Sequence, residues 1–364
     1  MEKHKTKVVE MKRLLILISM FVLSAVLCAQ SEDLMKYVPA DVDGFACVNM
    51  KELSAYPKFK EMIDTNPDPE MAQFKDDLTQ AGIDIYDAFG NGVIFYNSKT
   101  RIGGGVMKTK IEEATFSKLL DNRAQGATPV KKTAIDGKTY YVFEKGGQKT
   151  TMVYLKPDTI GFTDKPENAT KFSSLAATEN VTSNSKLMGY AAKVDKKAPL
   201  WAVFVTDIKL PNSGQNQEGG DNNPVQQMFP VDNIQGGLLS INFTGETKDT
   251  VNLNLRVNCK EKMKAQILTL QVQTLTVTYI PMLSKGNEAL SGQLMKAINF
   301  ANEENDIVIK VEVTPALQAE LSKMAENNSF NLNDLQPPAP GQKKRKGPKA
   351  PAPNEPAQPP QPAN

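Results

Sequence analysis

Clustered carboxylates are the residues whose types and spacing come nearest to a reaction site in this chain. They form three groups: Asp41/Asp43, Asp84/Asp87 and Glu303/Glu304/Asp306. A glycosidase or a hard-cation site needs two or more such groups in one cleft. Each group lies at an expected turn or helix end, where acids commonly cap helices and face solvent. We therefore predict no catalytic, cofactor-binding or metal-binding residue and no enzyme, and we keep a carboxylate-only hydrolase as the third hypothesis.

The only histidine of the chain, His4, precedes an apolar run from Leu14 to Leu27 that itself follows Lys12 and Arg13. A bilayer span takes about 20 residues, so this shorter run is typical of a secretory signal. Cleavage after Ala29 would leave no imidazole for Ser-His-Asp or Cys-His catalysis or for a histidine-ligated metal. We expect residues 1–29 to be a signal peptide and the protein to be exported, into the periplasm or outside the cell.

The three cysteines leave two questions open. Leu27 and Ala29 suit ordinary signal peptidase, which would release a free protein, whereas lipidation of Cys28 would make a lipoprotein. Cys47 and Cys259 lie far apart in apolar patterns, and we expect buried free thiols rather than a disulfide between them.

The charge of the exported chain is close to zero. Residues 1–29 hold five Lys or Arg and two Glu, which leaves 38 basic and 39 acidic residues. Such a chain has no general field for nucleic acid or anionic membranes. The exception is the tail 336–364, which holds ten of the 23 prolines and which we expect to be disordered. This tail carries a basic cluster of Lys343, Lys344, Arg345 and Lys346. The cluster could contact an anionic partner, such as an envelope polymer or lipid headgroups, or it could simply keep a flexible end soluble.

Hydrophobic periodicity predicts the elements that would position these groups. Strands are expected at 42–50, 92–97, 101–108, 130–135, 139–144, 150–156, 159–163, 200–206, 236–243, 250–259 and 307–313. Helices are expected at 51–65, 69–81, 111–122, 166–177, 260–283, 287–301 and 315–327, and a mobile loop at 211–224. The segment 260–283 partly alternates as a strand would. A helix is favoured because the following apolar residues recur at three and four residue steps: Ala265, Leu268, Val272, Leu275 and Tyr279. Gly103-Gly104-Gly105 lies within an expected strand, where close backbone packing or a bulge explains it better than a phosphate loop.

The order of these elements predicts an α+β fold of two related halves. Strand, helices, hairpin and helix follow one another from 42 to 122, and strand, short helix, hairpin and helix from 200 to 283. We expect an N-terminal half at 34–198, a C-terminal half at 199–335 and a disordered tail at 336–364. The sheets should be mainly antiparallel, with helices packed on one face.

The opening Tyr37-Val38-Pro39-Ala40-Asp41, the strand after it, Lys51-Glu52-Leu53 and Pro57 resemble the start of uncharacterised exported bacterial proteins built from two related α+β halves. Leu200-Trp201-Ala202-Val203 reopens the pattern midway, so that the resemblance covers residues 34 to 327. It implies the same fold, and it brings no established activity or site residue.

These observations together indicate an exported protein of the cell envelope with a non-enzymatic binding or structural role. Its partner would be an envelope protein or an anionic envelope polymer, and a membrane would be met only through the signal or a lipid on Cys28. The alternative is a carrier of an apolar or lipid-like ligand, which 15 methionines and the apolar segment from Ile267 to Leu283 favour.

Overall fold

The computed structural model describes residues 32–65, 69–123, 130–145, 148–164, 166–172, 175–176, 178–206, 233–284 and 287–326. Several predicted features lie outside the described residues. These are the signal with Cys28, the loop 211–224, and the tail with Lys343, Lys344, Arg345 and Lys346.

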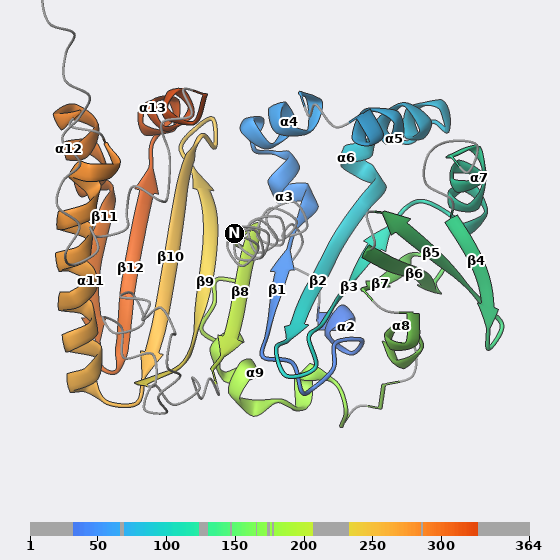
Figure 1. The fold of residues 1–364 in the computed structure, drawn as a ribbon, viewed down its shortest axis with the longest axis horizontal. Helices are drawn as coiled ribbons and strands as arrows, with labels where there is room; N and C mark the ends of the chain where they lie inside the picture. Colours follow the sequence, from blue (N-terminus) through green and yellow to red (C-terminus); the bar gives the residue numbers. More distant parts are fainter. Residues whose placement is uncertain are drawn as a thin grey trace, which may run out of the picture.

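One antiparallel sheet of twelve strands runs through the described chain (Figure 1). The strands are β1 (Gly44–Val48), β2 (Phe89–Asn97), β3 (Ile102–Thr109), β4 (Val130–Ile135), β5 (Lys138–Lys145), β6 (Gln148–Lys156), β7 (Thr159–Thr163), β8 (Leu200–Val205), β9 (Ile234–Thr244), β10 (Thr250–Cys259), β11 (Ile298–Glu303) and β12 (Asp306–Val313). Their order across the sheet is β11-β12-β10-β9-β8-β1-β2-β3-β7-β6-β5-β4. The predicted α+β class and antiparallel pairing are confirmed, but the sheet is continuous.

The two predicted halves meet at the pairing of β1 with β8. From β1 the chain steps outward through β2 and β3 on one side, and from β8 it steps outward through β9 and β10 on the other. The division into 34–198 and 199–335, and the relatedness of those segments, stay predictions.

Helices pack against both faces of the sheet, so the expectation of one covered face is wrong. The helices are α2 (Glu32–Met35), α3 (Met50–Ser54), α4 (Pro57–Asp64), α5 (Pro69–Gln80), α6 (Ile85–Ala88), α7 (Glu113–Arg123), α8 (Pro166–Phe172), α9 (Ser185–Ala191), α11 (Lys262–Leu283), α12 (Glu288–Ala297) and α13 (Pro315–Glu326), with a 3-10 turn at Val181–Ser183. Trp201 packs with residues of α9, whereas its neighbour Leu200 packs with residues of α3 and α4. Because successive strand residues point to opposite faces, these helices lie on opposite sides.

The largest hydrophobic cluster lies under the centre of the sheet, on the α2 and α9 side. Trp201 in β8 is 1% exposed, and its ring meets that of Phe45 in β1 edge to face, with centroids 5.7 Å apart. Leu187 and Ala191 of α9 pack against this cluster and are buried in it. β1 and β8, which the sequence predicts as strands, therefore contribute to this core.

Three local features differ from the sequence expectation or refine it. The predicted helix 51–65 is split into α3 and α4, because Tyr56 precedes Pro57 and a residue before proline disfavours helical geometry. The predicted helix 287–301 ends at Ala297, and the chain continues as β11, which the sequence analysis missed. Gly105 lies in β3 as expected, where a Cβ atom would stand 2.4 Å from the ring of Phe162.

Cys47 and Cys259 do not pair with each other. Cys259 is a buried free thiol that packs with residues of α11, whereas Cys47 packs with Trp201 in the cluster on the opposite face. The free-thiol prediction is confirmed for Cys259 and wrong for Cys47, which is disulfide-bonded.

We expect Trp201→Ala to lower the free energy of unfolding by about 3–5 kcal/mol, because it empties a large volume in a core that cannot fully collapse. Tyr96→Ala, at a 38% exposed aromatic residue of β2, should cost about 1 kcal/mol or less. Urea denaturation followed by circular dichroism measures both variants. Equal losses for the two variants would show that Trp201 does not hold the centre of the sheet.

Candidate functional site

The carboxylates near the two ends of β2 accept hydrogen bonds that stabilise the adjoining turn and helix. The Asn97 side chain donates to Asp41 Oδ2 at 3.1 Å, and the Ser98 N–H donates to Asp43. At the other end of the strand, Asp84 caps α6 by accepting the Tyr86 N–H at 2.9 Å. The nine residues of β2 separate the two pairs by roughly 26 Å at about 3.3 Å per residue.

The third acidic group belongs to the hairpin between β11 and β12. Arg256 Nη1 lies 3.0 Å from Asp306 Oδ2, and its other terminal nitrogen contacts Glu303. Burial alone would lower the pKa of Arg256, but the hydrogen bonds to both carboxylates raise it overall. Glu304 occupies the turn with a φ of 55°.

The fold therefore keeps the three carboxylate groups of the sequence analysis apart. β12, which begins at Asp306, and β1, which follows Asp43, are four strand spacings apart, about 19 Å across the sheet. In the part of the chain that the structure describes, no three His, Cys, Asp or Glu residues are grouped so as to hold a metal ion.

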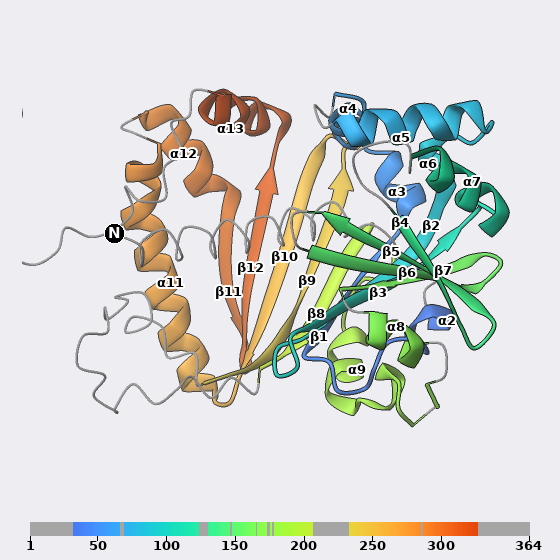
Figure 2. The ribbon, with the colours of Figure 1, turned by 45° about the vertical axis from the view of Figure 1, so that its right-hand side comes forward.

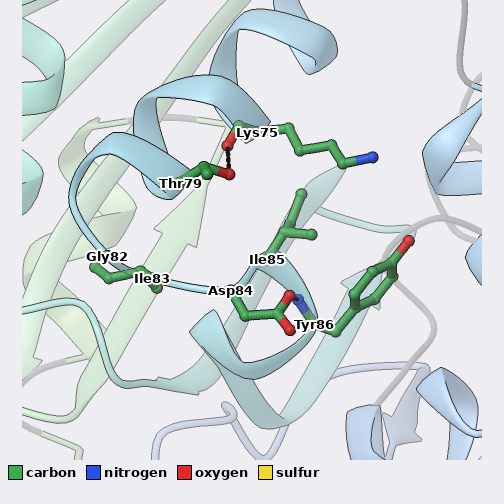
Figure 3. A pocket seen from close by; sticks show the side chains of 7 residues that line it. All are labelled: Lys75, Thr79, Gly82, Ile83, Asp84, Ile85 and Tyr86. Atoms are coloured by element: carbon green, nitrogen blue, oxygen red, sulfur yellow. Dashed lines mark hydrogen bonds between the residues drawn. The ribbon is translucent and has the colours of Figure 1, made fainter.

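A small surface cavity of about 300 Å³ lies between α5 and α6 (Figure 3). It is lined by Lys75, Thr79, Gly82, Ile83, Asp84, Ile85 and Tyr86. Lys75 pairs with Asp64, whose pKa this hydrogen bond lowers, and the Thr79 hydroxyl donates to the Lys75 carbonyl at 2.8 Å. Burial, followed by the neighbouring Asp64 carboxylate, raises the pKa of Tyr86 to about 12. The volume of the cavity is at the lower limit for ligand pockets. Its polar side chains already bond to neighbouring groups, as the Tyr86 hydroxyl does by donating to the Lys60 carbonyl at 3.2 Å.

The most unusual surface of the described chain is the outer face of α11. Five large apolar side chains of this helix are exposed: Met263 62%, Ile267 43%, Leu270 63%, Val277 57% and Met282 52%. Figures 1 and 2 show the helix at the end of the molecule, alongside β11 and β12. We call Met263, Ile267, Leu270, Thr274, Val277 and Pro281 the outer stripe, because all six are exposed along one side of the helix.

The inner face of α11 explains why the helix forms here. Ala265 and Leu268 are buried against Cys259 of β10 and Ile307 of β12. Thr269, also buried, accepts a hydrogen bond of 2.8 Å from the Asn302 side chain of β11. The helical spacing of the apolar residues predicts this inner face correctly, since Ala265 and Leu268 belong to that pattern.

The outer stripe itself was missed by the sequence analysis. The available signal was the lack of any charged residue from 265 to 283, which makes the helix apolar or uncharged on every side. A helix that is hydrophobic all round is normally buried on all sides. Here the sheet and α12 cover only part of the helix, so the remaining side presents apolar groups to solvent.

The comparisons with known proteins give a distant structural likeness only. No protein-family model and no curated protein matches the sequence. The fold is similar to crystal form III of TP0453, a Treponema pallidum protein, with a TM-score of 0.47 and 12% identity over 80% of this chain and 97% of that chain. Crystal form I gives 0.44 and 11% over 80% and 97%, and crystal form IV gives 0.43 and 10% over 80% and 96%.

Among the helices of the described ranges, α11 included, none is long and apolar enough to cross a membrane.

We expect Leu268→Ala and Leu270→Ala to differ sharply, although both are the same change in one helix. Leu268 is 4% exposed, and its truncation should cost about 2–4 kcal/mol, whereas truncation of the exposed Leu270 should stay within about 0.5 kcal/mol. Denaturation of dilute protein, where association adds no stability, measures both. A large loss for Leu270→Ala would mean that the outer stripe serves the fold of the single chain.

Proposed function

We propose that this chain is an exported binding protein of the cell envelope, without catalytic activity, and that the outer stripe of α11 is its contact surface. The observation that carries the proposal is the exposure of an uncharged apolar stripe on a helix whose other side is packed on the sheet. Contiguous exposed apolar surface on a folded protein marks an interaction site, because its burial against a partner is favourable.

The size of α11 suits this role. Its 22 residues correspond to a length of about 33 Å, sufficient for an extended contact. The helix is anchored by the residues that pack on β10 and β12, so binding need not order it first. A rigid helix face of this kind is a common recognition element for a second helix.

The other candidate surfaces support the proposal less well. The acidic side chains already bond to neighbouring groups, and these bonds stabilise a turn, the N-terminus of α6 and the β11-β12 hairpin. The cavity at Tyr86 is small for a lipid-like ligand. A carrier function and a carboxylate hydrolase therefore rank below binding through α11.

Export is the second part of the proposal, and it is supported by the apolar run before Cys28. Cells expressing the full sequence should place the protein outside the cytoplasm, whereas deletion of residues 14–27 should retain it inside. Fractionation and the mass of the purified chain measure this. A mass that matches a chain starting at Gln30 indicates the free form, and a lipid adduct on Cys28 indicates the lipoprotein. Cytoplasmic retention of the intact sequence would contradict export.

The contact surface is tested by incorporating a photo-crosslinking amino acid at Leu270 in cells that express the full sequence. We expect light-dependent adducts from Leu270, because a bound partner lies against the outer stripe. The matched control is Met62 of α4, an exposed apolar helix residue that is 37% exposed, which should give none. Absence of adducts at Leu270, and also at Met263 and Val277, would refute the assignment of this surface.

A further inference from the structure

The spacing of the outer stripe matches one seam of a coiled coil. Its six residues follow one another in steps of four, three, four, three and four along α11. Alternating steps of three and four average 3.5 residues, the repeat that keeps one side of a helix against a second helix. The stripe is thus spaced to take a helix as its partner.

The spacing of this seam is the same from either end of the helix. Met263 and Pro281, Ile267 and Val277, and Leu270 and Thr274 lie at equal distances from the midpoint of the seam. An antiparallel second α11 would therefore place Ile267 against Val277 of the other copy and Leu270 against Thr274 of the other copy. A two-fold dimer requires such self-complementarity, since both subunits present the same patch.

The side chains beside the central part of the stripe carry no charge. They are Gln266, Gln271, Gln273 and Thr278. Near a two-fold axis each flanking residue faces its own copy, so a charge there would repel itself. The charged residues Lys262 and Lys264 lie at the helix start, and an antiparallel partner would place its negative C-terminal end beside them.

The hydroxyl groups of the stripe and its flank are already satisfied. Thr274 donates to the Leu270 carbonyl and Thr278 to the Thr274 carbonyl, each at 2.8 Å. Burying these threonines would leave no unpaired donor, so the usual cost of desolvating a hydroxyl is largely avoided. The stripe can accordingly be covered by an apolar partner along its whole length.

A membrane surface fits the stripe less well. Helices that lie in the lipid interface typically carry many Lys and Arg residues on the polar face beside Trp, Phe or Leu on the apolar face, and α11 has no charged residue from 265 to 283. One of the two central positions of the outer stripe is the small β-branched Thr274, which suits the close approach of another helix.

We infer that a second copy of this chain packs antiparallel on α11, with the outer stripes of the two copies forming the dimer seam. The inference rests on the proposed function and deepens it, because it names the partner of the same surface. The paired α11 helices would join the two copies at the end of each sheet where β11 is the edge strand.

Sedimentation velocity of the protein isolated from cells that express the full sequence tests this. We expect a concentration-dependent dimer, and we expect Leu270→Glu to raise its dissociation constant at least about 100-fold, because it buries an unpaired charge in each copy. The matched control is Leu321→Glu on α13, where a leucine is 37% exposed and lies outside the stripe. It should dimerise as the wild type does. Circular dichroism confirms that both variants fold.

Disulfide trapping reports the direction of packing. Ile267→Cys combined with Val277→Cys should give a cross-linked dimer under mild oxidation, whereas Ile267→Cys alone should not. Equal cross-linking by the single variant would indicate a parallel pair and overturn the antiparallel seam.

The remaining outcomes separate the inference from the proposed function. A monomer at all concentrations up to about 100 μM, with Leu270 adducts to another protein in cells, would overturn the dimer and leave the contact surface in place. The protein could instead stay monomeric and co-sediment with vesicles of phosphatidylethanolamine and phosphatidylglycerol, with Leu270→Glu abolishing this co-sedimentation. That result would also overturn the dimer and leave the contact surface in place, with a membrane as the partner. A monomer without adducts or vesicle binding would overturn both.

Discussion

The antiparallel pairing of β1 with β8 is the interaction on which the rest of this structure depends. It is the step in the strand order that joins the strands of 44–163 to those of 200–313. Gly44 stands opposite Phe204, and a Cβ atom at Gly44 would lie 2.7 Å from the Val203 carbonyl oxygen, so the backbones approach more closely than a side chain allows. The Trp201 and Phe45 rings then pack beside this ladder on one face, while Val48 and Leu200 pack on the other.

From this central pair, the sheet grows outward until β11 forms an edge strand. α11 packs across β10, β11 and β12 at that end, which covers apolar side chains such as Ile307 on one face. The helix needs only its inner side for this contact. Because its composition is uncharged all round from 265 to 283, the packing that stabilises the sheet also leaves an apolar surface on the outside. The proposed contact surface is thus a consequence of where the sheet ends.

The acidic residues are of a type that could catalyse a reaction, but in this fold they stabilise local structure. Asp84, Asp306 and Asp41 would each suit acid–base chemistry by type. In the fold each accepts hydrogen bonds from nearby groups, and the distance between them across and along the sheet prevents a shared cleft. The proposed function accordingly relies on shape and apolar area instead of on reactive groups, and α11 is where those two properties coincide.

The sequence by itself determined the α+β class and most strands, and it favoured a helix over a strand at α11 with the correct inner face, because these follow from local periodicity in hydrophobicity. It also determined that Gly105 sits in a strand under close packing. Only the tertiary structure decided that the strands form one sheet, that helices cover both faces, that β11 follows α12, and that the outer stripe stays exposed. These features depend on pairing between residues far apart in the chain, such as Cys47 with Trp201, and on which side of a helix finds a partner. Periodicity locates the apolar positions of an uncharged helix, but burial of one side and exposure of the other are set by the sheet that meets it.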